Sequence, residues 1–199
     1  MHLYEALAEQ VVDWRRRGYP CDEYPAISEI LDWAANPDGA GFRLRVPQIH
    51  ALETYWYLRL VEKTPHIFDL YRRIFESTSD LLEALGVSNN AFGEVDYDRE
   101  QLWKAIKTDD DLVRRYRLQS LRETLLLGYP SYILALAMGV GKTILIGAII
   151  ASEFAMALEH PDGDFVENAL VFAPGKTIIE SLRELADIPY ERILPPRFY

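Results

Sequence analysis

Apolar residues recur every three or four positions through most of the first 127 residues, which is the spacing of one face of an α-helix. Residues 2–17 show the pattern clearly, and Gly18 and Pro20 end it. Another helix is expected to begin at Pro47, because proline is favoured at the first helical position. The pattern predicts the remaining helices at residues 26–35, 47–63, 67–75, 80–85, 100–106 and 112–127.

The pattern changes after Gly128, where two continuous apolar runs occur at residues 132–137 and 169–173. Such runs are typical of strands that are buried on both faces of a parallel sheet. A helix is expected after each run, at residues 144–158 and 177–186, and the first is apolar on nearly every side, as in a buried helix. The sequence therefore predicts an α/β fold class, with a helical N-terminal part before the beginning of a parallel-sheet domain.

Composition limits the possible partners and the setting. The 199 residues carry 31 Asp and Glu against 21 Lys and Arg, and the net charge of −10 opposes non-specific attraction to nucleic acid or anionic lipid. Any phosphate binding must therefore be local. Cys21 is the single cysteine, and neither a signal-peptide pattern nor an uninterrupted apolar span of roughly 20 residues is present. We expect a cytoplasmic protein with no membrane partner.

A glycine-containing turn lies between the first predicted strand and its helix. Gly139 and Gly141 allow the backbone to fold tightly around an anion, with N–H groups that no Cβ obstructs. The following helix contributes the positive end of its dipole, Lys142 is placed to reach the β- and γ-phosphates, and the Thr143 hydroxyl is placed to bind Mg²⁺. This order predicts a site for ATP and Mg²⁺.

The match to the P-loop pattern is partial, because Leu136 stands where the strict pattern has its first glycine. A structural turn at the start of a helix is the alternative interpretation. The residues expected to contact the nucleotide are Met138, Gly139, Val140, Gly141, Lys142 and Thr143.

Residues 137–143 resemble motif I of superfamily 2 helicases and translocases, in particular the restriction subunits of type III restriction enzymes and related DEAD/DEAH-box proteins. Residues 170–176 resemble motif Ia of the same superfamily, in which Pro174, Gly175 and Lys176 would contact nucleic-acid phosphates. The alternative for Lys176 is a solvated lysine at the start of a helix.

The resemblance implies a RecA-like P-loop domain and an ATP-dependent motor, with Lys142 and Thr143 in the catalytic roles and Mg²⁺ at Thr143. It also implies movement on DNA, expected to be double-stranded, a role in restriction or DNA defence, and a modification (methyltransferase) subunit as a possible partner.

Residues 43–48 resemble the arginine-and-glutamine motif of this superfamily, in which the glutamine hydrogen-bonds the adenine edge. An amide donates and accepts at once, which suits adenine, so Gln48 is expected to bind the cofactor. Gln48 lies much farther from Lys142 than the family's spacing allows, so residues 64–128 would be a helical insertion between residues 1–63 and residues 129–199. Gln119 is a rival candidate, and an ordinary polar residue at a helix N-terminus is the other alternative.

Other features of the superfamily are missing after Thr143, where no apolar strand ends in paired carboxylates. We therefore expect an N-terminal portion of a larger motor that hydrolyses ATP poorly by itself. Two alternatives remain. One is a P-loop kinase or transferase, whose lid arginines could only be Arg183, Arg192 and Arg197, and the other is a non-enzymatic docking module formed by residues 1–128.

The remaining polar groups carry weaker signals. The four histidines are scattered without metal-ligand spacing, so no metal site beyond Mg²⁺ is expected. The arginine clusters at residues 15–17 and 114–117 are interpreted as solvated helix faces, although they could hold a nucleic-acid backbone.

Overall fold

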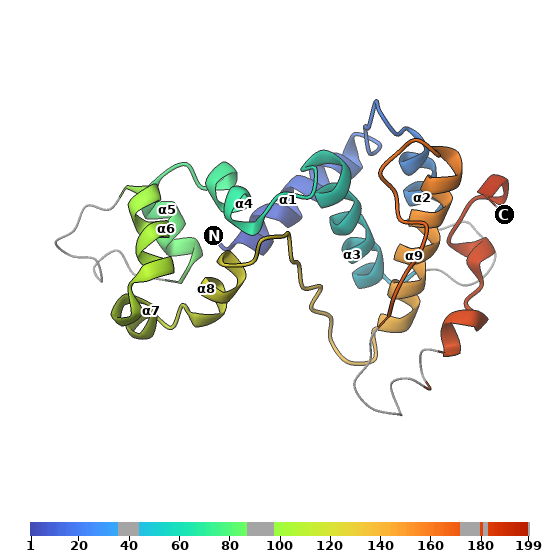
Figure 1. Ribbon diagram of the computed structural model, residues 1–199. Helices are drawn as coiled ribbons and strands as arrows, with labels where there is room; N and C mark the ends of the chain where they lie inside the picture. Colours follow the sequence, from blue (N-terminus) through green and yellow to red (C-terminus); the bar gives the residue numbers. More distant parts are fainter. Residues whose placement is uncertain (36–43, 87–97, 172–179, 181–182, 199) are drawn as a thin grey trace. The chain divides into compact units, whose positions relative to one another are not determined.

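The computed structural model describes residues 1–35, 44–86, 98–171, 180 and 183–198 (Figure 1). The chain forms two compact units, which we describe separately. Unit 1 comprises Met1–Gln10 and Glu62–Ile133, and unit 2 comprises Val11–Val61 and Leu134–Tyr199. Helix α1 (Leu3–Arg16) contributes residues to both units.

Unit 1 contains short helices, most of which begin at a polar side chain. They are α4 (Ile67–Ile74), α5 (Thr78–Ala84), α6 (Arg99–Thr108), α7 (Asp110–Tyr116) and α8 (Gln119–Leu125). The side chains of His66, Ser77, Asp98 and Asp109 accept hydrogen bonds from first-turn amides of α4, α5, α6 and α7. Each cap satisfies backbone donors that a helix N-terminus leaves unpaired.

The core of unit 1 is organised around Trp103, which is buried on α6. Phe68 and Tyr71 of α4 meet the Trp103 ring edge-on, with ring centroids 4.8 and 5.7 Å away. Leu81 of α5 and Val113 of α7 are buried in the same cluster. The apolar faces of several short helices therefore share one core, which compensates for the marginal stability of each helix alone.

Unit 2 is built on the pairing of α3 (Val46–Trp56) with the 18-residue helix α9 (Lys142–Glu159), and α2 (Ala26–Ala35) contacts both (Figure 1). A π-helical segment, Tyr57–Val61, continues α3. Short 3₁₀ segments follow α9 near the C-terminus, at Arg183–Asp187, Tyr190–Arg192 and Pro196–Phe198.

Buried polar contacts fix the interface between α3 and α9. The Trp56 indole N–H donates to the Ser152 hydroxyl over 3.0 Å, and both side chains are fully buried. Glu153, only 2% exposed, accepts from Arg59 Nε at 2.7 Å and from the Tyr55 hydroxyl. Burial and the bond to Glu153 both raise the pKa of Tyr55, so this hydroxyl stays neutral and donates.

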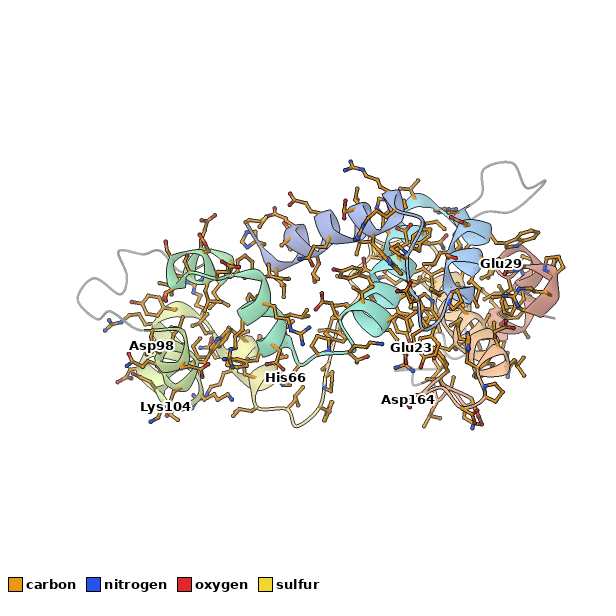
Figure 2. All side chains as sticks on the ribbon, turned by 90° about the horizontal axis from the view of Figure 1, so that it is seen from above. Glu23, Glu29, His66, Asp98, Lys104 and Asp164 are labelled. Carbon is orange, nitrogen blue, oxygen red and sulfur yellow. The ribbon has the colours of Figure 1, made fainter. Side chains whose placement is uncertain are left out.

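The loop after α9 is held by the same residues. The amide of Val166 donates to Glu153 at 3.0 Å, and Arg59 donates to the carbonyl of Asp164, which Figure 2 labels. A second buried carboxylate, Glu53, accepts from Arg15 Nε and from the Tyr19 hydroxyl, each at 2.6 Å. The charges inside unit 2 are thus paired, as buried charges need to be.

The predicted helices of the N-terminal part are confirmed, with one interruption. Residues 26–35 are helical over the predicted range, as α2. The helix expected at residues 112–127 is divided into α7 and α8, because Arg117 adopts a left-handed conformation with φ of +56°.

The predicted α/β fold class, with a RecA-like parallel sheet at its P-loop, is wrong for the part of the chain that the structure describes, which is helical and contains no strand. Residues 132–137 have no regular secondary structure, and Ile133 is 91% exposed. In the second apolar run, residues 169–173, the side chain of Leu170 is 79% exposed, and residues 172 and 173 lie outside the described residues. A strand requires a hydrogen-bonded neighbour, which apolar composition alone does not supply.

Within the described residues, no helix has the length and apolar character needed to cross a membrane.

Glu153→Ala should destabilise the protein by about 3 kcal/mol, because removal of one partner leaves Arg59 and Tyr55 without their buried acceptor. The measurement is urea denaturation followed by circular dichroism. Glu159→Ala is the matched control on the same helix, since Glu159 pairs with Arg197 at the surface and should contribute under about 1 kcal/mol. Equal losses in the two variants would contradict the structural role of Glu153.

Candidate functional site

The glycine-containing turn leads directly into the N-terminus of α9. Gly139 and Gly141 have φ of +77° and +85°, a left-handed conformation that glycine adopts at little cost. Gly141 is the N-cap of α9, and no side chain caps this end of the helix. The first-turn amides, which have no acceptor within the helix, therefore face outward at the positive end of the helix dipole.

Two residues at the start of α3 hold this turn in place. Gln48 Nε2 donates to the Gly141 carbonyl at 2.8 Å, and an Arg45 guanidinium N–H donates to the Gly139 carbonyl at 2.7 Å. Gln48 Oε1 also accepts from the backbone amide of Arg45 at 2.6 Å. We call Arg45 and Gln48 the α3 brace.

The α3 brace determines the direction of the backbone amides in the turn. In a trans peptide the carbonyl and the following N–H point in opposite directions. The carbonyls of Gly139 and Gly141 point to the brace, so the N–H groups of Val140 and Lys142 point away from it. This is the polarity that an anion-binding turn requires.

The side chains of the turn leave it open to solvent. Met138 is 95% exposed, Lys142 is exposed, and Thr143 and Val140 are half-buried. Among the described residues, no carboxylate forms an ion pair with Lys142. Its ammonium group therefore remains available beside the outward-facing amides.

Gln48 lies next to the turn despite the long separation in sequence, and its amide is already engaged. The side chain is 1% exposed and bonded at both its oxygen and its nitrogen. Its contact with adenine stays a prediction. The rival, Gln119, is the exposed first residue of α8 in unit 1.

The remaining candidates give no further site. Pro174, Gly175 and Lys176 lie outside the described residues, as does Arg43 of the arginine-and-glutamine motif. Within the described residues no group of three His, Cys, Asp or Glu side chains is arranged to hold a metal ion. In the basic clusters, Arg15, Arg17 and Arg114 are paired with Glu53, Asp13 and Asp111.

Arg45 lies within the predicted arginine-and-glutamine motif at residues 43–48, but no contact with the turn was predicted for it. The spacing contained a usable signal, because a glutamine at the third helical position commonly accepts from the N-cap amide, as Gln48 does from Arg45. The bonds of both side chains to Gly139 and Gly141 depend on tertiary packing, which local spacing does not reveal.

Comparisons with protein-family models, with curated proteins and with solved structures gave no match to this chain. The function is therefore inferred from the turn and the α3 brace.

Gly141→Ala should destabilise the protein more than Gly139→Ala. Both substitutions place a Cβ on a left-handed residue, which costs roughly 1–2 kcal/mol. At Gly141 the new Cβ would lie 2.6 Å from Gln48 Nε2, whereas at Gly139 it would enter open space. Gln48 must then give up its bond to Gly141. Thermal denaturation measures the difference, and equal losses would show that Gln48 moves away freely.

Proposed function

We propose that residues 139–143 bind the triphosphate of ATP together with Mg²⁺. The observation that carries the proposal is the polarity of the turn, whose carbonyls are bonded to the α3 brace while its amides continue into the uncapped N-terminus of α9. A structural turn alone would not require, at the first helical position, an exposed lysine that forms no ion pair with any described residue.

In this proposal each residue has a defined task. The amides of Val140 and Lys142 donate to phosphate oxygens, and the Lys142 ammonium neutralises the terminal phosphates. The Thr143 hydroxyl is a ligand for Mg²⁺, which supplies charge neutralisation when bound. The helix dipole of α9 adds to the field at the same point.

We further propose that the intact protein is an ATP-dependent motor on double-stranded DNA. This step rests on the resemblance of residues 137–143 and 170–176 to motifs I and Ia of superfamily 2. Lys176 would contact the DNA backbone, and a modification subunit would be a partner in a cytoplasmic restriction system. Hydrolysis additionally needs carboxylates that position water and metal, so the activity assigned to residues 139–143 is nucleotide binding.

The kinase alternative receives less support. A lid arginine must be free to reach the transferring phosphate, but Arg197 is paired with Glu29 at 2.6 Å and with Glu159 at 2.8 Å (Figure 2 labels Glu29). Arg183 is exposed in a 3₁₀ segment with no described contact to the turn.

Lys142→Ala should weaken binding of Mg²⁺·ATP by at least about tenfold, because a charge-assisted contact to phosphate contributes more than 1.4 kcal/mol. Equilibrium titration with a fluorescent ATP analogue measures the affinity. Lys104→Ala, at an exposed lysine of α6 (Figure 2), is the matched control and should bind as the native protein does. In the intact protein Lys142→Ala should abolish DNA-stimulated ATP hydrolysis, and retained hydrolysis would refute the assignment.

A further inference from the structure

The side-chain amide of Gln48 is hydrogen-bonded within the protein at both its oxygen and its nitrogen. Its oxygen accepts from Arg45 N at 2.6 Å, its nitrogen donates to the Gly141 carbonyl at 2.8 Å, and the side chain is 1% exposed. To read adenine, an amide must present a donor and an acceptor together on an accessible edge. The amide edge of Gln48 is used within unit 2.

Reorienting Gln48 toward a base would release both of these bonds. The Gly141 carbonyl would lose a contact that fixes the direction of the Lys142 amide, and the Arg45 amide would lose its acceptor. A contact between Gln48 and the base would thus cost the contact with Gly141. That lost contact lies in the part of the turn that is proposed to hold the phosphates. The two roles oppose each other.

We infer that Gln48 is a positioning residue of the phosphate-binding turn, and that the site selects nucleoside triphosphates by their triphosphate and not by their base. This inference rests on the proposed function of residues 139–143. It deepens that function by naming the substrate class as ATP, GTP, CTP and UTP alike.

The position of Gln48 relative to the turn explains how this residue would act without touching the nucleotide. Gln48 bonds the carbonyl of Gly141, and the N–H of the same peptide belongs to Lys142 and points the opposite way. Loss of the side chain frees that peptide to rotate. Every ligand that uses the Lys142 amide should then be weakened by the same factor.

The experiment is a displacement titration of a fluorescent ATP analogue, with Mg²⁺ present, by ATP, GTP, CTP, UTP and inorganic tripolyphosphate. The native protein should bind the four nucleotides within about threefold of one another, because a base without hydrogen-bond readout adds little discrimination. Gln48→Ala should weaken all five ligands by a common factor of roughly tenfold, the equivalent of one lost hydrogen bond. Gln101→Ala, at an exposed glutamine of α6, is the control and should change none of them.

Three results would overturn the inference. A native protein that prefers ATP by more than about tenfold would show base readout, and this measurement needs no variant. Weakening of ATP alone by Gln48→Ala, with tripolyphosphate unchanged, would assign Gln48 to adenine. Unchanged binding of every ligand by Gln48→Ala would remove its positioning role. Failure of the proposed function is distinct, since then neither the nucleotides nor tripolyphosphate would displace the analogue.

Discussion

Two hydrogen bonds from side chains to backbone carbonyls determine the conformation of the candidate site. Gln48 bonds the carbonyl of Gly141 and Arg45 bonds the carbonyl of Gly139, so the start of α3 holds the turn that begins α9. Peptide geometry then orients the intervening amides away from α3. Because of this orientation, the Val140 and Lys142 amides lie on the same side as the uncapped end of α9, where Lys142 is exposed.

The α3–α9 pair that supports the turn is fixed by polar contacts as well as by apolar packing. Trp56 donates a hydrogen bond to Ser152 in the interior. Glu153 accepts hydrogen bonds from Tyr55, Arg59 and the Val166 amide. A buried carboxylate with several donors is satisfied in only one arrangement of its neighbours. These contacts therefore specify how α9 lies on α3.

The helices were predictable because their apolar positions follow the helical period, as in α1 and α2. The break at Arg117 was not, since neither a glycine nor a proline marks the left-handed residue. The apolar run that includes Ile133 predicted a strand, but strand formation depends on a neighbour elsewhere in the chain. The residues of the turn were proposed from local chemistry, whereas the bond from Gln48 to Gly141 depends on a tertiary contact.

The long separation in sequence between the α3 brace and the turn that it contacts has a consequence for biosynthesis. Gln48 and Gly141 are 93 residues apart, and most of that interval is unit 1. At about 5–20 residues per second, a ribosome needs roughly 5–20 s to make this interval. During that time α3 has left the peptidyl-transferase centre without its partner helix, so the turn acquires its shape only after Gly141 and the residues of α9 have been made.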